Sequence, residues 1–221
     1  MFEDRTDAGV KLAEKLDDYA GRDDVIVWGL PRGGVIVALE VARALDAPLD
    51  VSGVRKLGVP DQPELAMGAV ATGGVRVLND EILAMLHISD KVIDDVTRRE
   101  IRVLERRQLE WSGDVEPSDP EGKTVILVDD GLATGATMRA VIKAARGRNP
   151  ARIVVAVPVA PPDVRQEFEA LVDRVVCVST PEPFYGVGAW YRDFRQTTNQ
   201  DVRNALEEAR GWSAPDAPGA G

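Results

Sequence analysis

The chain is poor in the residues that most often build metal centres and covalent cross-links. It contains one cysteine, Cys177, and one histidine, His87, among its 221 residues. These counts exclude an internal disulfide, a cysteine-rich zinc site and a metal centre with several histidines. Cys177 falls in a predicted buried strand, where a free thiol packs as a small apolar side chain. We expect His87 to be structural or exposed rather than catalytic.

Long apolar runs and excess positive charge are also missing. The longest apolar run, residues 153–160, includes a proline and is far too short to span a membrane. The first ten residues are acidic and polar, unlike a signal peptide. Lys and Arg total 27 against 37 Asp and Glu, a net charge of −10. Such a surface repels phosphate backbones and anionic lipids, so we expect a cytoplasmic protein that binds neither nucleic acid nor membrane.

What remains is the composition of an ordinary globular domain, 44% hydrophobic and 29% charged. Short Val/Ile-rich runs alternate with helical patterns, which predicts an α/β fold. We expect a mostly parallel five-stranded sheet flanked by helices, a Rossmann-like core. The strands are predicted at residues 25–30, 49–54, 124–129, 152–159 and 174–178. The main helices are predicted at 5–20, at 135–147, at 162–172 and, after a turn at 31–34, in a run that ends at Leu45.

An excursion from this core is predicted at about residues 58–122. An irregular stretch with two prolines follows residue 54, and residues 66–72 and 75–78 are expected to pair as a hairpin. Residues 79–112 are predicted to be helical, with Ser89 as an N-cap. The whole is expected to be one domain over residues 1–211, with a core at about 5–180, a C-terminal hood at about 181–200 and a disordered Ala/Pro/Gly-rich tail at 212–221.

The most informative segment, residues 125–137, reads Val-Ile-Leu-Val-Asp-Asp-Gly-Leu-Ala-Thr-Gly-Ala-Thr. A buried strand ends in two carboxylates, and a loop of small residues then opens a helix. Amides of such a loop can cradle a phosphate, and carboxylates suit the hydroxyls of a polyol such as ribose. The loops after parallel strands are where ligands bind in this fold class. The plainer alternative is a strand followed by a capped helix.

This segment resembles the phosphoribosyl pyrophosphate (PRPP) signature of the type I phosphoribosyltransferases. Residues 29–34, Gly-Leu-Pro-Arg-Gly-Gly, resemble the family's pyrophosphate loop, and Arg55-Lys56 resemble its basic strand end. With residues 64–70, these motifs resemble an uncharacterised bacterial and archaeal subgroup. Residues 29–34 have the alternative of a simple turn with a solvated arginine. Arg55-Lys56 have the alternative of a charged strand end without a binding role.

The resemblance implies a role for each matching residue. The 5′-phosphate would be bound by Gly131, Leu132, Ala133, Thr134, Gly135, Ala136 and Thr137. Pyrophosphate would be bound by Pro31, Arg32, Gly33, Gly34, Arg55 and Lys56. The catalytic set would be Asp129, Asp130, Arg32 and Lys56, with the two aspartates on the ribose hydroxyls. Mg²⁺ would be held mainly through PRPP, and in part by the same aspartates. Residues 58–74 resemble the loop that closes over the reacting centre.

Aromatic residues, scarce elsewhere, gather near the C-terminus. Five of the eleven lie within residues 184–194. The family carries a base-recognising hood there, so we expect Phe184, Tyr185, Trp190 and Tyr191 to contact the acceptor. A hydrophobic flap or a dimer interface is the alternative. Ala133 stands where purine-salvage members carry an acidic residue, which slightly favours a pyrimidine-like acceptor over a purine.

The function implied is Mg²⁺-dependent transfer of a 5-phosphoribosyl group from PRPP to an unidentified, nucleobase-like acceptor, with release of pyrophosphate. The family resemblance also implies a homodimer with a role in nucleotide metabolism. The alternative is a regulatory protein that binds PRPP or a nucleotide without catalysis. A last group of charges, the arginines of the predicted long helix, is expected to form a solvated, ion-paired face: Arg98, Arg99, Arg102, Arg106 and Arg107.

Overall fold

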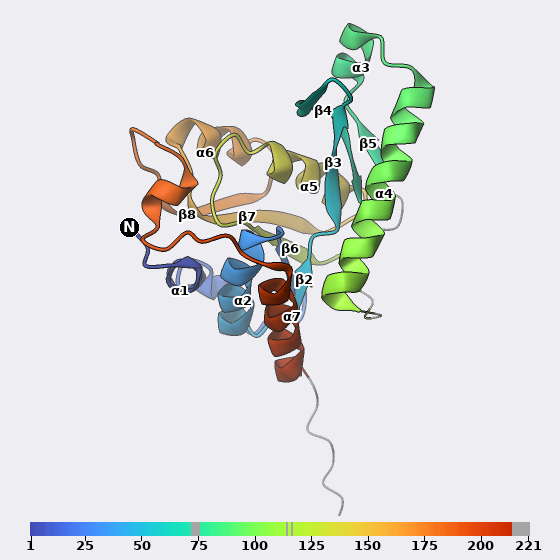
Figure 1. Ribbon diagram of the computed structural model, residues 1–221. Coiled ribbons are helices and arrows are strands. Elements are labelled where there is room, and N and C mark those ends of the chain that lie inside the picture. Colours follow the sequence, from blue (N-terminus) through green and yellow to red (C-terminus); the bar gives the residue numbers. More distant parts are fainter. Residues whose placement is uncertain (72–75, 114, 116, 214–221) are drawn as a thin grey trace, which may run out of the picture.

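The computed structural model describes residues 1–71, 76–113, 115 and 117–213. Its centre is a five-stranded sheet whose strands all run parallel, in the order β2-β1-β6-β7-β8 (Figure 1). Strands β1 and β6 are buried along their whole length, which explains their uninterrupted apolar sequences. The predicted parallel sheet is confirmed. The strands are β1 (Val25–Gly29), β2 (Leu49–Val51), β6 (Thr124–Val128), β7 (Arg152–Val159) and β8 (Arg174–Ser179).

Helices cover both faces of this sheet, as Figure 1 shows. On one face lie α1 (Arg5–Ala13), α2 (Gly33–Leu45) and α7 (Asn199–Ser213), and on the other α5 (Ala136–Arg146) and α6 (Pro162–Glu169). The chain leaves β1 for one face and leaves the adjacent β6 for the other. The ends of these two strands therefore form a topological switch point, where ligands bind in open α/β sheets.

Two helices differ from the prediction. The first ends at Ala13 rather than near residue 20, and a short 3₁₀ turn, Asp17–Tyr19, follows it. Helix α7 was not predicted, and it extends into the expected tail as far as Ser213. Val202, Ala205, Leu206 and Ala209 are buried along it at helical spacing, so packing on the core stabilises it. The rest of the predicted tail, 214–221, lies outside the described residues.

The excursion is a second, antiparallel sheet with two helices against it. Its strands, in the order β3-β4-β5, are β3 (Val54–Val59), β4 (Gln62–Ala71) and β5 (Arg76–Leu78). The pairing of β4 with β5 confirms the predicted hairpin, whose turn lies outside the described residues. The irregular stretch expected after residue 54 is wrong, because β3 pairs with β4 and buries Leu57 against Met67, Ile93 and Val96 in a core of its own. The prolines fall in the turn and near the start of β4, where a missing N–H is tolerated.

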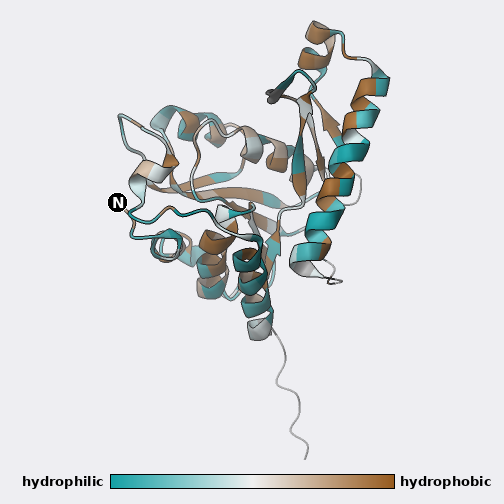
Figure 2. Ribbon diagram, viewed as in Figure 1, coloured by the Kyte–Doolittle hydropathy of each residue, from teal (hydrophilic) through white to brown (hydrophobic). Residues whose placement is uncertain are grey.

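The predicted helical run after this sheet is two helices, α3 (Asp80–Leu86) and α4 (Asp90–Ser112). The break falls at His87, which is exposed and ends α3 in the left-handed conformation. Ser89 is the N-cap residue of α4, as predicted, although its side chain makes no capping hydrogen bond. Hydrophobic residues fill the strands of both sheets, and hydrophilic residues cover much of α4 (Figure 2). None of the described helices combines the length and apolar character needed to cross a membrane.

The small core of the excursion supports a stability prediction. Leu57 is fully buried there, so we expect Leu57→Ala to lower the free energy of unfolding by about 2–5 kcal/mol, the usual result of leaving a cavity. Leu109→Ala is the matched control because Leu109 is 60% exposed, and it should change stability by about 0.5 kcal/mol or less. Urea denaturation measures both. Equal effects of the two changes would contradict a packed core in the excursion.

Candidate functional site

The site is built on the aligned ends of β1 and β6. Gly29 is in register with Val128, and the N–H of Leu30 donates to the carbonyl of Val128 at 2.8 Å. The loops that follow these strands therefore leave the sheet side by side. One carries Arg32, which is the N-cap residue of α2 after a cis peptide bond from Pro31. The other begins with Asp129 and Asp130.

Two glycines let these loops come into contact. A Cβ atom at Gly33 would lie 2.0 Å from Oδ2 of Asp130, and one at Gly34 would lie 2.7 Å from Cα of Asp129. Neither distance is possible for a real side chain. The start of α2 therefore lies directly against the two carboxylates only because both positions are glycine.

The two carboxylates are largely removed from water. The Asp130 side chain is 18% exposed, and its backbone N–H donates to Oδ1 of Asp129 at 2.8 Å. Burial, and then repulsion by Asp130, raise the pKa of Asp129 well above its ordinary value. Burial also raises the pKa of Asp130, although Arg5 opposes that change. When both carboxyl groups are ionised, the pair carries more negative charge than Arg5 alone offsets.

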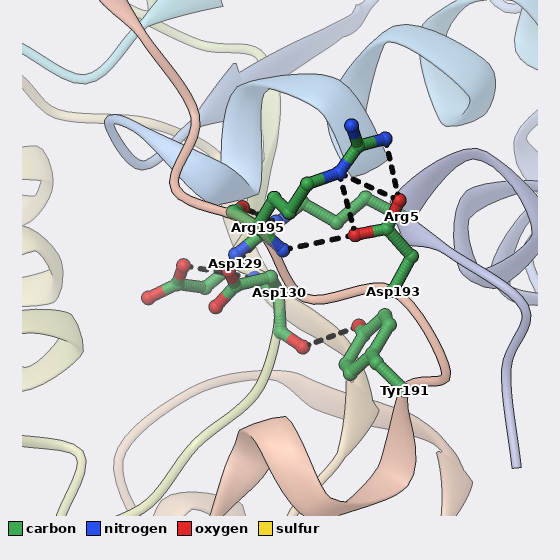
Figure 3. A network of polar contacts seen from close by, with 6 residues as sticks. All are labelled: Arg5, Asp129, Asp130, Tyr191, Asp193 and Arg195. Atoms are coloured by element: carbon green, nitrogen blue, oxygen red, sulfur yellow. Dashed lines mark hydrogen bonds and ion pairs between the residues drawn. The ribbon is translucent and has the colours of Figure 1, made fainter.

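Arg5 neutralises part of the charge of the carboxylate pair. Sequence reasoning missed this residue. Its Nε and one terminal nitrogen each lie 2.8 Å from Oδ2 of Asp130, and its other terminal nitrogen donates to the carbonyl of Arg195 at 2.8 Å (Figure 3). The guanidinium lies 4.1 Å from the centre of the Phe194 ring. No local pattern marks Arg5, because its partner is 125 residues away.

The predicted hood is tied to the same carboxylate pair. Tyr191 is buried, and its hydroxyl donates to the backbone carbonyl of Asp130 at 2.6 Å (Figure 3). Its ring packs between those of Phe2 and Phe194. The N–H of Phe2 also donates to the carbonyl of Trp190, so the N-terminal segment runs along the hood. Burial, and then the charge of Asp130, raise the pKa of Tyr191.

The four aromatic residues expected to contact an acceptor do not form one exposed surface. Tyr185 is 80% exposed, whereas Tyr191 is buried. Phe184 and Trp190 are partly buried in the cluster that contains Tyr191 and Phe2. The alternative of a hydrophobic flap therefore describes the surroundings of Tyr191 better than a stacking surface does.

The loop after Asp130 has the geometry of an anion cradle. Its base is held by Leu132, whose N–H donates to the carbonyl of Val159 at 2.9 Å. Gly135 has φ +69°, and a Cβ there would lie 2.4 Å from the Phe168 ring, so only glycine fits before α5 begins. Ala133, Thr134 and Thr137 are exposed. The N–H groups of residues 133–135 donate to no other described residue, which leaves them available to an anion.

Arg55 and Lys56 lie in β3 of the excursion, not at the end of a central strand as expected. The chain leaves β2 at Val51 and crosses to the second sheet. Both residues therefore approach the site from the excursion. They line a cavity of about 340 Å³, together with Pro31 of the first loop and Thr137 of the second. Arg55 and Lys56 thus lie beside the loops that follow β1 and β6. The sequence did not indicate that a second sheet would place them there.

No group of three or more His, Cys, Asp or Glu side chains that could hold a metal ion occurs within the described ranges. The carboxylates nearest to both loops are Asp129 and Asp130. Cys177 is partly buried in β8, and burial raises the pKa of its thiol, as expected for a packed side chain.

Comparison with known proteins places the chain in a family. The family model for the phosphoribosyl transferase domain matches residues 3–190. The chain therefore belongs to the phosphoribosyl transferase family, whose enzymes are pentosyltransferases. Two Mycobacterium tuberculosis proteins, each named "Putative phosphoribosyl transferase", are 46% identical over 209 residues, which is 95% of this chain. The chain spans only 47% of the length of these curated relatives.

Solved structures show the same fold. The crystal structure of the protein TT1426 from Thermus thermophilus is 42% identical, with a TM-score of 0.81 over 94% of this chain and 98% of that one. The AQ2163 protein of Aquifex aeolicus is similar in fold alone, at 12% identity and a TM-score of 0.50 over 91% of this chain and 84% of that one.

The raised pKa values lead to a pH-dependent stability prediction. Between the unfolded and the native pKa of Asp129, the native state binds more protons than the unfolded state, so wild-type stability falls as pH rises through that interval. Asp129→Asn keeps an Oδ1 acceptor and loses the charge. We expect the variant to be more stable than wild type, by an amount that grows with pH and levels off above the native pKa. Each unit of pKa difference corresponds to about 1.4 kcal/mol.

Asp130→Asn is the matched comparison, and its gain should be smaller because Arg5 already offsets the Asp130 charge. Urea unfolding at a series of pH values from about 4 to 8 measures both differences. A stability gain for Asp129→Asn that shrinks with rising pH would contradict the assignment of a buried, electrostatically strained carboxylate.

Proposed function

We propose that this chain transfers the 5-phosphoribosyl group of PRPP to a nucleobase-like acceptor and releases pyrophosphate. The observation that carries the proposal is the buried Asp129–Asp130 pair, which lies between a glycine-dependent loop and an anion cradle at the switch point of the sheet. A phosphate ester and a polyol are the groups that such neighbours recognise together. Family membership supports the same reaction class.

In this proposal the loop 131–137 holds the 5′-phosphate through its free amides and threonine hydroxyls. Asp129 and Asp130 accept hydrogen bonds from the ribose hydroxyls. Oδ2 of Asp130 is already paired with Arg5, whereas its Oδ1 accepts from no other described residue. Arg5 is therefore a positioning residue, because it holds the Asp130 carboxylate in one orientation and offsets its charge. Glycine at positions 33 and 34 keeps the carboxylates against the start of α2.

The leaving group lies on the basic side of the site. We assign Arg32 and Lys56, with Arg55 and the amides of Gly33 and Gly34, to the pyrophosphate. As the C1′–O bond breaks, negative charge grows on pyrophosphate, and fixed positive groups lower the energy of that state. The ribose then carries positive charge, and the acceptor adds from the opposite face. No covalent intermediate with the protein is needed.

The donor set also fits Mg²⁺, which prefers oxygen ligands and usually keeps substrate phosphates among them. When bound, the ion would neutralise pyrophosphate oxygens, and most of its ligands would come from PRPP. Asp129 and Asp130 are the two carboxylates of this chain that we assign to any remaining ligand position.

Fewer residues of the site bear on the identity of the acceptor than on that of PRPP. Ala133 supplies no carboxylate for a purine ring nitrogen, so we propose a pyrimidine-like base ahead of a purine. Among the hood aromatics Tyr185 has the largest exposed fraction, 80%, and we assign it to stack on a flat ring.

Calorimetric titration with PRPP and Mg²⁺ tests the sugar-phosphate site. We expect wild type to bind, and the Asp129→Asn, Asp130→Asn double variant to lose affinity by tenfold or more, since a hydrogen bond to a charged group contributes about 1.5–3 kcal/mol. Asp23→Asn is the control, because Asp23 is exposed and lies just before β1 begins, at the end of the strand opposite to the site. Absence of PRPP binding by folded wild type would overturn the proposal.

Pyrophosphate release in the presence of pyrimidine and purine bases tests the transfer itself. The expected result is release that depends on an acceptor and that the double variant lacks. Binding of PRPP without release for any acceptor would contradict the transferase assignment and favour the regulatory alternative.

A further inference from the structure

One wall of the 340 Å³ cavity comes from a helix that sequence analysis assigned to solvent. Arg99 and Arg107 of α4 line this cavity beside Arg55 and Lys56 of β3. Arg99 is paired with Glu100, which also accepts from Arg55 at 2.6 Å. The expectation of a solvated face holds for Arg98, which is 66% exposed and paired with Asp95 on its own helix. Arg99 and Arg107 are exposed as well, but they also line the cavity beside β3.

Arg107 is the unbalanced charge of the group. It forms no ion pair with any residue in the described part of the chain, and its guanidinium lies only over the Trp111 ring, at 5.9 Å. Burial, and then the positive charges of Arg55 and Arg32, lower the pKa of Arg107. Positive charges are thus gathered at one place, and the nearby carboxylates of Glu110 and Glu100 only partly oppose the lowering of the Arg107 pKa. Such an arrangement favours an anion that carries more than one negative charge.

Two unsatisfied hydrogen-bond donors belong to residues that line the same cavity. Ser52 and Trp111 both line it, and both are at least nine-tenths buried. The Ser52 hydroxyl and the Trp111 indole N–H have no hydrogen-bond partner among the described residues. Buried polar groups are rarely left unpaired, so two of them beside an uncompensated arginine point to a missing acceptor.

We infer that Arg107, the indole N–H of Trp111 and the hydroxyl of Ser52 bind the pyrophosphate group from the side of the excursion. The inference rests on the proposed function, and it adds α4 and the β2–β3 connection to the residues that hold the leaving group. Pro31 and Thr137 line the same cavity, so an anion there would lie between the two loops that we assign to PRPP. The ligand class is a diphosphate ester or inorganic pyrophosphate.

Arg107→Gln tests this assignment, with Arg106→Gln as its matched control. Arg106 is the neighbouring residue on α4 and is exposed like Arg107, but it does not line the cavity. Calorimetry with inorganic pyrophosphate and with PRPP should show a tenfold or greater loss of affinity for Arg107→Gln and less than a twofold change for Arg106→Gln. Ribose 5-phosphate, which lacks the pyrophosphate, should bind all three proteins equally. Thermal melting confirms that each variant is folded.

Trp111→Phe is a second variant that keeps an aromatic ring in the core and removes only the indole N–H. We expect it to weaken pyrophosphate binding by about fivefold, equivalent to about 1 kcal/mol, the usual net contribution of one hydrogen bond. Its affinity for ribose 5-phosphate should stay unchanged.

The outcomes separate this inference from the proposed function. Unchanged pyrophosphate affinity in Arg107→Gln, or wild type that binds ribose 5-phosphate but no pyrophosphate, would overturn the inference alone. Wild type that binds pyrophosphate through Arg107 but neither PRPP nor ribose 5-phosphate would overturn the proposed function and leave the anion site standing. Wild type that binds none of the three would contradict both.

Discussion

Two adjacent, largely buried carboxylates lie where the chain leaves the central sheet, and the surrounding structure is arranged around them. Gly33 and Gly34 are glycines because α2 begins in direct contact with Asp129 and Asp130. Arg5 reaches the pair from the N-terminal helix, and Tyr191 reaches it from the hood. Since both partners must be held in place, residues 2–5 and 190–195 pack against each other. Segments from both ends of the chain are thereby organised by one pair of charges in its middle.

The charges on the two sides of the switch point are complementary in sign. One side holds carboxylates whose pKa values are raised, and the other holds arginines of which one has a lowered pKa. Hydrogen-bond donors of a ligand would stabilise the carboxylates, and its negative charges would stabilise the arginines. The loop with Pro31 and Arg32 lies between these two groups of side chains. A molecule with hydroxyls at one end and a diphosphate at the other meets both needs at once. This supports the proposal of PRPP over a simple phosphate ester. In the proposed reaction, the fixed positive groups would stabilise the charge that develops on a leaving diphosphate.

The parts predictable from sequence are those with a local signal. The strand before Asp129, the small-residue loop and the glycines of residues 29–34 lie within short segments, and the structure brings these segments together. Arg5 and Arg107 have no such signal, because each depends on contacts made only after distant elements pack. Helix α7 has a readable apolar stripe that was overlooked. Strand β3 was missed because prolines near the turn favoured a loop, whereas its pairing with β4 buries Leu57.

The position of Arg107 follows from how α4 joins the two parts of the molecule. The first half of α4 packs Ile93 and Val96 into the small core of the excursion. Near its C-terminal end, Trp111 belongs instead to the large core beneath the central sheet, with α2 and α7. Arg107 precedes Trp111 by one helical turn, so the anchored end of the helix determines where its guanidinium lies. The basic wall of the cavity is therefore attached to the same rigid core as the carboxylate pair, and the distance between the two is set by packing rather than by a free loop.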